Sequence, residues 1–310
     1  MPSRYAGPAP VSPEAALREE IRMEDILRRL TEDRSGLHFS KGQRRIAEFI
    51  RSNYDKAAFM TAERLGRTVG VSESTVVRFA SDLGYDGYPG MRKALQDMVR
   101  SRLTAVQRIE VASETMDESK LLESVMMADM DKLHSTLHEI DRGSFNSAVD
   151  AIAGANHVYI VGMRSSTSLA GFLGFYLNLL LENVHIIQDT AQSEVYEQIM
   201  RIKPGDVFIG ISYPRYSSRT IKAMNYARTA GATVIGLTDG ETSPFVGVAH
   251  ILLYAKSDMM SFLDSLVAPM SLINALIVAV GARNKDRVSD TFERLETIWV
   301  NYDVYEHAGD

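Results

Sequence analysis

Two short segments of this sequence combine hydroxyl side chains with one arginine each, a set of donors suited to an anion. The first reads GMRSST at 162–167 and the second reads SYPRYSS at 212–218. Each segment lies between a strand-like run and a helical pattern, so free N–H groups of a helix N-terminus are expected beside it. Hydroxyls, a guanidinium and these N–H groups together favour binding of phosphate or carboxylate. The candidate ligand-binding residues are Arg164, Ser165, Ser166, Ser212, Arg215 and Ser217. The alternative is that the hydroxyls serve only as helix N-caps.

A parallel sheet is needed to bring these two segments together. From residue 145 onward strand-like and helix-like blocks alternate. Strands are expected at 157–162, 184–187, 206–212, 232–238 and 250–255, and helices at 168–181, 191–202, 217–230, 260–282 and 286–302. This βα repetition predicts an α/β fold with a five-stranded parallel sheet and helices on both faces. In the flavodoxin-like order 2-1-3-4-5, the loops after the first and third strands are neighbours at the switch point where ligands bind.

A second functional pattern lies at 61–83, TAERLGRTVGVSESTVVRFASDL. Its apolar residues recur at helical intervals in two halves, which predicts two short helices across a tight turn. Gly66 falls where the helices must approach closely, and Gly70 falls where the first helix should end with a positive φ. Ser72 is placed to cap the second helix. The pattern predicts a helix-turn-helix, with an ordinary helical hairpin as the alternative.

The second helix of such a motif enters the DNA major groove, and its outward residues here are polar. A glycine-rich turn follows, and a further helix is expected from about residue 90, whose start is a usual place for phosphate contacts. The candidate DNA-binding residues are Ser72, Ser74, Thr75, Arg78, Tyr88 and Lys93. Arg44, Arg45 and Arg51 form a basic face on the preceding helix, which contacts phosphates or is simply solvated.

The distribution of charge agrees with a nucleic-acid partner for this segment only. Residues 40–108 hold 13 Lys and Arg against 7 Asp and Glu, a net charge of +6, whereas the whole chain carries −6. From residue 111 to the end there are 15 Lys and Arg against 25 Asp and Glu, a net charge of −10. A polyanion would be attracted by the first part and repelled by the second.

The remaining segments are expected to be helical. A patternless stretch at 1–12 precedes an amphipathic helix that begins near Ser12-Pro13, and another helix is expected from Ser40. Residues 101–140 have helical periodicity and few turn residues, which indicates a connecting helix that packs against something, such as a second subunit.

With these motifs in place, the chain resembles RpiR-type transcriptional regulators over nearly its whole length. LGRTVGVSESTVVRFASDLGYDGYPGMRKAL is similar to the family's N-terminal signature, and 145–285 resembles its SIS (sugar isomerase) domain. The expected organisation is a tail and helix at 1–35, a helix-turn-helix domain at 36–110, a helical linker at 111–144, the SIS domain at 145–285, and a C-terminal helix and tail at 286–310. By resemblance, Ser74, Thr75 and Arg78 face the groove, Ser166 and Ser212 match the serines that hold the phosphate of phosphosugars, and Ser217 matches a further hydroxyl position.

Two departures from the usual SIS loops change what the site is expected to bind. The family's loops read like G-x-G-x-S and S-x-S-G-x-T; here Arg164 replaces the second glycine, and Pro214 and Arg215 replace the Ser-Gly pair. Proline removes a backbone donor, and the loss of glycine restricts the backbone that would wrap a phosphate. The expected effector is therefore an anionic, sugar-derived metabolite, either a phosphosugar held differently or a sugar acid.

The resulting hypothesis is a DNA-binding transcriptional regulator with no catalytic residues, cofactor or metal, acting as a homodimer or homotetramer on a double-stranded operator. The main alternative is a phosphosugar isomerase, for which Glu194, His157 and His185 are candidate bases. A nicotinamide-binding protein is a weaker alternative because the G-x-G-x-x-G series is missing.

Composition favours the cytoplasm and excludes several site classes. The chain has 0 cysteines, which excludes disulfides and thiolate zinc sites, and its seven histidines are scattered. No signal peptide opens the sequence, and the longest apolar run, 266–281, is shorter than the roughly 20 residues of a membrane span. No membrane partner is expected.

Overall fold

The computed structural model describes residues 39–99, 106, 108–109, 118–188, 192–257 and 263–305. The chain divides into two compact units, residues 1–128 with 258–265 and residues 129–257 with 266–310. The amphipathic helix expected after residue 12 lies outside the described residues, as do most of the positions expected to be helical between 100 and 117.

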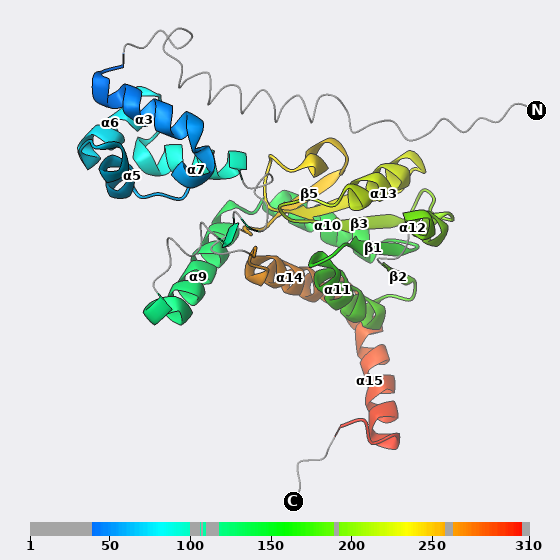
Figure 1. Ribbon diagram of the computed structural model, residues 1–310. Helices are drawn as coiled ribbons and strands as arrows, with labels where there is room; N and C mark the ends of the chain where they lie inside the picture. Colours follow the sequence, from blue (N-terminus) through cyan, green and yellow to red (C-terminus); the bar gives the residue numbers. More distant parts are fainter. Residues whose placement is uncertain are drawn as a thin grey trace, which may run out of the picture. The chain divides into compact units, whose positions relative to one another are not determined.

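The described part of the first unit is helical. Its helices are α3 (Lys41–Ser52), α4 (Tyr54–Ala57), α5 (Ala62–Val69), α6 (Glu73–Asp82) and α7 (Gly87–Val99) (Figure 1). Helix α3 begins where expected because Ser40 and Gln43 form a reciprocal capping box. The helices enclose a small apolar core centred on Phe79, Ile46 and Leu65, all fully buried. The Gln43 amide also donates to the Asp82 carboxylate at 2.7 Å, which joins α3 to the end of α6.

The second unit is built on one parallel sheet of order β2-β1-β3-β4-β5. Its strands are β1 (Val158–Gly162), β2 (Val184–Ile187), β3 (Val207–Ile211), β4 (Thr233–Thr238) and β5 (Ile251–Tyr254). The described helices of this unit and of the connection into it are η1 (Glu118–Lys120), α9 (Leu121–Glu139), α10 (Arg142–Ala153), α11 (Ser166–Leu180), α12 (Gln192–Ile199), α13 (Ser218–Thr229), η2 (Pro244–Gly247), α14 (Val267–Arg283) and α15 (Lys285–Asn301). The predicted fold class and strand order are confirmed.

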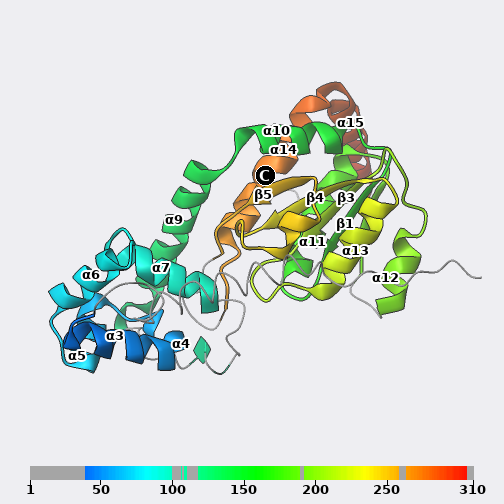
Figure 2. The same ribbon diagram turned by 90° about the horizontal axis from the view of Figure 1, so that it is seen from above.

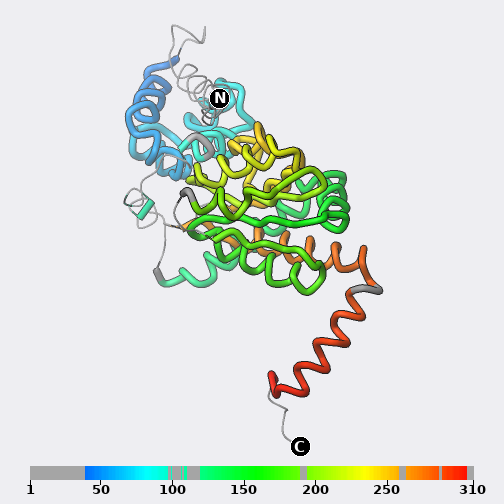
Figure 3. The backbone as a smooth tube through the Cα atoms, turned by 90° about the vertical axis from the view of Figure 1, so that its right-hand side faces the viewer, coloured from blue at the N-terminus to red at the C-terminus, as the bar shows by residue number. Residues whose placement is uncertain are grey.

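Two apolar layers hold the helices against the sheet. One face of the sheet packs on α10, α11 and α14, and the other packs on α12, α13 and η2 (Figures 1 and 2). The three strands β1, β3 and β4 are almost wholly buried, as expected for the centre of a doubly covered parallel sheet. Helix α15 runs away from this body (Figure 3).

Some element boundaries differ from those expected. Helix α11 begins at Ser166 rather than 168, and α7 begins at Gly87 rather than near 90. Helix α10 was not predicted as a separate element; it begins where the Asp141 carboxylate accepts hydrogen bonds from the N–H groups of Gly143 and Ser144. Each difference concerns a local capping or turn arrangement, and none alters the order of the sheet.

Candidate functional site

The turn between α5 and α6 has the close geometry that its two glycines predict. Gly70 ends α5 with a φ of 70°, and a Cβ at Gly66 would lie 2.9 Å from the Val71 carbonyl oxygen. The Arg45 guanidinium donates to the Gly70 carbonyl at 3.3 Å, so this arginine of the basic face on α3 supports the turn. Both glycine predictions are confirmed, and α6 follows α5 with no room for a larger residue at 66.

The start of α6 presents a group of exposed hydroxyls. The Ser72 oxygen accepts from the Thr75 N–H at 3.3 Å, and it lies 2.9 Å from the Ser74 hydroxyl and 2.8 Å from the Thr75 hydroxyl. Arg78 is exposed one turn beyond Ser74, while Val76 and Phe79 are fully buried on the opposite side. The outward residues therefore share one face of α6, as the sequence predicts.

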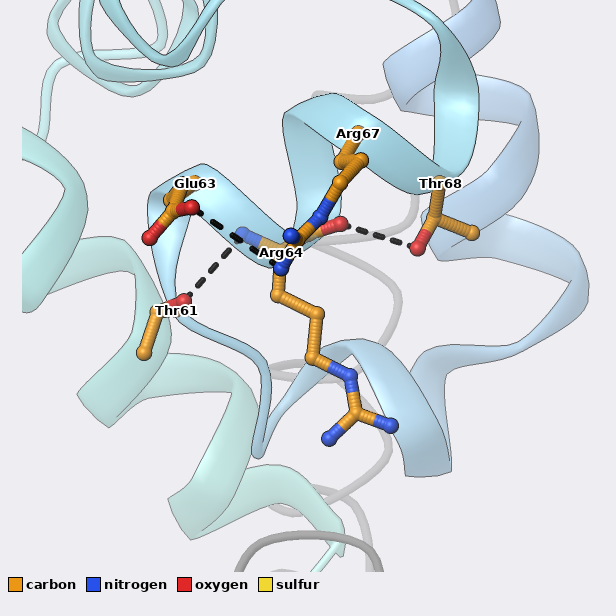
Figure 4. A network of polar contacts seen from close by, with 5 residues as sticks. All are labelled: Thr61, Glu63, Arg64, Arg67 and Thr68. Carbon is orange, nitrogen blue, oxygen red and sulfur yellow. Dashed lines mark hydrogen bonds and ion pairs between the residues drawn. The ribbon is translucent and has the colours of Figure 1, made fainter.

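Helix α5 is fixed at its own N-terminus by a local polar network (Figure 4). The Thr61 hydroxyl accepts from the Arg64 N–H at 3.1 Å, and the Thr68 hydroxyl donates to the Arg64 carbonyl at 2.8 Å. Arg67 pairs with Glu63 at 3.8 Å, and both side chains are largely exposed. These contacts involve only residues of α5 and its cap, and the Thr61 cap is the contact that stabilises the helix.

Tyr88 requires a correction, because its side chain belongs to the core rather than to a DNA-contacting surface. It is 4% exposed, and its hydroxyl donates to the Met60 carbonyl at 2.8 Å. Burial raises the pKa of this phenol to about 12, with a smaller opposing effect of the Arg92 charge. Lys93, by contrast, is exposed on α7. An aromatic residue near the start of a helix can pack in the core or face DNA, and the local sequence does not show which of the two applies to Tyr88.

In the second unit, the two hydroxyl-rich loops lie at the carboxyl ends of adjacent strands. Gly162 at the end of β1 is in register with Ile211 at the end of β3, so the loops that follow start side by side. A Cβ at Gly162 would lie 2.3 Å from the Ser166 carbonyl oxygen, which shows how closely α11 begins against the strand. The neighbouring placement that the sequence predicts is confirmed.

The first loop uses part of its backbone to close on itself. The N–H groups of Ser166 and Thr167 donate to the carbonyls of Met163 and Arg164 at 3.2 and 3.0 Å. Ser166 is 4% exposed, whereas Arg164 and Ser165 are exposed. The expectation of several available helix N-terminal N–H groups is therefore wrong for these two amides.

The second loop is fastened by its own serines. The Ser217 N–H donates to the Ser212 hydroxyl at 3.1 Å, and the Ser217 hydroxyl caps α13 by accepting from the Thr220 N–H at 3.3 Å. Both oxygens act as acceptors for backbone donors, which leaves each O–H able to donate outward. Ser217 thus has the capping role considered from sequence, and that role is compatible with ligand contact.

The two arginines share an unusual backbone conformation. Arg164 has a φ of 57° and Arg215 a φ of 68°, both in the left-handed region. A residue with a Cβ pays about 1–2 kcal/mol in this region, where glycine is unstrained. The loops therefore keep the backbone shape that glycine would supply, with a long cationic side chain added to each.

A carboxylate that sequence reasoning missed lies at the next strand end. Asp239 follows β4 and is 5% exposed, and its Oδ1 accepts from the Tyr216 hydroxyl at 2.8 Å and from the Thr238 hydroxyl at 3.2 Å. Burial, and then the Asp239 charge, raise the pKa of Tyr213. Burial, followed by the Glu241 and Asp239 charges, raises that of Tyr254. The sequence signal that could have identified Asp239 is its position directly after a buried strand, at the sheet edge where the two loops lie.

The candidate isomerase bases do not gather at this edge. His157 precedes β1 and His185 lies in the first half of β2, and their ring nitrogens are 3.1 Å apart toward the amino ends of these strands. Burial, followed by the His157 charge, lowers the pKa of His185. Of the three candidate bases, only Glu194 follows the carboxyl end of a strand. It lies in the first turn of α12, the helix after β2.

The described residues contain no group of three or more His, Cys, Asp or Glu arranged to hold a metal ion. No single described helix is long and apolar enough to cross a membrane; by length and composition only, α14 and residues 288–301 would qualify as a bent pair.

Comparison with known proteins matches both parts of the chain. Residues 25–102 match the helix-turn-helix domain of the rpiR family, and residues 151–279 match the SIS domain. The sugar isomerase domain of an RpiR transcription factor from Sphaerobacter thermophilus is 27% identical, covering 57% of this chain and 99% of that chain with a TM-score of 0.54. The NanR protein of Vibrio vulnificus, complexed with ManNAc-6P, is 23% identical and covers 92% of this chain and 100% of that chain with a TM-score of 0.55.

Proposed function

Because the chain belongs to the RpiR family of transcriptional regulators, we propose that α6 reads an operator and that the two serine–arginine loops bind the effector. On the DNA side, Ser74, Thr75 and Arg78 contact base edges, while Ser72 and Lys93 contact the backbone. The supporting observation is the single exposed face of α6, on which these hydroxyls and the guanidinium lie opposite a fully buried Val76 and Phe79. Guanidinium and hydroxyl groups are standard readers of base edges in the major groove.

The proposed effector is an anionic, sugar-derived metabolite, either a phosphosugar or a sugar acid. Its anionic group lies between the loops after β1 and β3, within reach of Arg164, Ser165 and Ser166 on one side. Ser212, Arg215 and Ser217 face it from the other loop. The relative from Vibrio vulnificus is complexed with ManNAc-6P, which supports a ligand of this class on the shared fold. A coupling of about 1–3 kcal/mol between effector and operator is enough for a useful switch.

We also propose a cytoplasmic homodimer or homotetramer. The supporting observation is apolar surface on the long helices. Leu122, Met130 and Leu137 of α9 are each more than 60% exposed, and Val300 of α15 is 60% exposed. Apolar surface of this kind favours association, and a symmetric dimer would match a palindromic operator.

The proposed action is binding without catalysis. The isomerase alternative depends on Glu194, whose helix turn follows β2 beside the first loop. If Glu194 were a base, its replacement by Gln would abolish turnover of a phosphosugar and leave operator binding unchanged. We expect no turnover from the native chain.

The test is a mobility-shift titration of the full chain on DNA from its own promoter region, with nonspecific competitor. Arg78→Ala is compared with Arg201→Ala, which changes an exposed arginine in the turn between α12 and β3. We expect selective retention that Arg78→Ala weakens at least tenfold and Arg201→Ala preserves. Equal loss in both variants, or no selective retention, would contradict the operator-reading role of α6.

A further inference from the structure

Helix α3 packs directly against the turn and the second helix of the helix-turn-helix (Figures 1 and 2). A Cβ at Gly42, in the first turn of α3, would lie 3.3 Å from Cγ1 of Val71 and 3.7 Å from Cγ2 of Thr75. The Gln43 amide donates to the Asp82 carboxylate at the last residue of α6. Because residues seven apart share one face of a helix, the start of α3 lies along the flank of α6 that carries Thr75 and Asp82.

Two exposed cations of α3 lie towards this flank of α6. A helix turns by about 100° per residue, so Arg45 lies within about 60° of Gly42 around the axis, and Lys41 lies about 40° beyond Arg45. The Arg45 guanidinium donates to the Gly70 carbonyl at 3.3 Å, and a Cβ at Gly70 would lie 2.4 Å from its Nη2. Arg45 is therefore held over the turn that leads into α6. A guanidinium has five N–H donors, so the bond to Gly70 leaves it able to donate to a further acceptor.

The other two arginines of the basic face lie on the opposite side of α3. Arg44 and Arg51 are exposed, and the same turn per residue places them about 160–180° from Gly42 around the axis. The basic face considered from sequence therefore divides in two, and only the half with Arg45 and Lys41 adjoins α6. Glu48 is exposed within about 20° of Lys41, which limits the basic surface beside α6 to the start of α3.

Resting on the proposed placement of α6 in the DNA major groove, we infer that Lys41 and Arg45 bind phosphates of the strand that borders this groove. The major groove is about 12 Å wide and a helix with its side chains is about 10–12 Å across, so a helix in the groove fills it. An element packed on the flank of that helix then meets the bordering phosphates. Arg45 presents a planar fork to two phosphate oxygens, and Lys41 acts as a point charge. Such contacts fix the position of α6 without reading bases.

Salt-dependent binding of the full chain separates a phosphate contact from base reading. Titrations would compare the native chain with Lys41→Ala, Arg45→Gln and the matched control Arg51→Gln, on promoter-region DNA and on an unrelated duplex of equal length. Glutamine keeps an N–H donor for the Gly70 carbonyl and removes the charge.

The expected size of the effect follows from counterion release. Each phosphate contact contributes about −0.9 to the slope of log K against log salt, so its loss weakens binding about eightfold at ~0.1 M salt. We expect Lys41→Ala and Arg45→Gln each to weaken both duplexes by about this factor per bound subunit and to flatten the slope. Arg51→Gln should leave affinity and slope at the native values for both duplexes.

The outcomes distinguish this contact from the operator-reading role of α6. Unchanged affinity and slope in Lys41→Ala or in Arg45→Gln would overturn the contact of that residue, and an equal loss in Arg51→Gln would overturn both. A loss confined to promoter DNA at the native slope would also overturn them, because phosphate contacts act alike on all sequences. A native chain without preference for promoter DNA, whose salt-dependent binding still falls in Arg45→Gln, would refute base reading by α6 and retain the contact of α3. If Arg45→Gln lowers Tm, the result for the exposed Lys41 decides.

Discussion

Replacing Arg215 with glycine should stabilise the SIS domain while weakening effector binding. The φ of 68° at this position places the Cβ of arginine in a region that costs about 1–2 kcal/mol, and glycine removes that cost. Glycine also loses about 0.5–1 kcal/mol more conformational entropy on folding. At the midpoints of the two ranges, the difference leaves a net stabilisation of about 0.7 kcal/mol.

Arg215→Ala is the matched control because alanine removes the guanidinium but keeps the Cβ. Its free energy of unfolding should therefore stay within about 0.5 kcal/mol of the native value, as for most exposed substitutions. For a unit of this size, each kcal/mol shifts Tm by about 2–4 °C, so Arg215→Gly should melt about 1–4 °C above Arg215→Ala. Both variants should lose effector affinity alike.

Differential scanning calorimetry of the three proteins without ligand gives the comparison directly. A glycine variant that melts at or below the alanine variant would refute the reasoning, because the left-handed strain would then be absent or relieved in solution. The same comparison at Arg164, where φ is 57°, provides an independent second measurement on the neighbouring loop.

Further substitutions test the DNA-binding unit. Tyr88→Phe should lower the free energy of unfolding by about 1–2 kcal/mol by leaving the Met60 carbonyl unpaired, with operator affinity unchanged. Since burial raises the Tyr88 pKa from 10.0 to about 12, its stabilising contribution is complete below pH 10 and is lost as pH rises towards 12; alkaline melts of Tyr88→Phe should lack this component. Ser72→Ala should cost about 1 kcal/mol by removing the α6 cap, whereas Ser74→Ala should leave Tm nearly unchanged and weaken operator binding in mobility shifts. Equal Tm losses for the two serine variants would contradict the distinct roles given to them.

The sequence predicted those features whose causes are local. Ser72 caps its helix as predicted, a helix begins after Ser40, and Ser217 has the capping role considered from sequence, because a hydroxyl before a helical pattern satisfies a free N–H wherever it occurs. The strand order was also predictable, since alternating buried strands and helices leave few parallel arrangements. Tyr88 and Asp239 were misplaced or missed because their roles depend on residues distant in sequence, the Met60 carbonyl and the Tyr216 hydroxyl.

The left-handed arginines show why the backbone geometry of the two loops could not be predicted from the sequence. Positive φ is normally signalled by glycine, and neither Arg164 nor Arg215 carries that signal. Glycine would fit both backbones with less strain, so backbone geometry alone does not account for arginine at either position. Strained residues of this kind cluster at ligand sites, and a guanidinium is suited to binding an anion. Two such positions on adjacent strand ends, in loops held by the hydrogen bonds of Ser212 and Asp239, support the anion-binding role proposed for these loops.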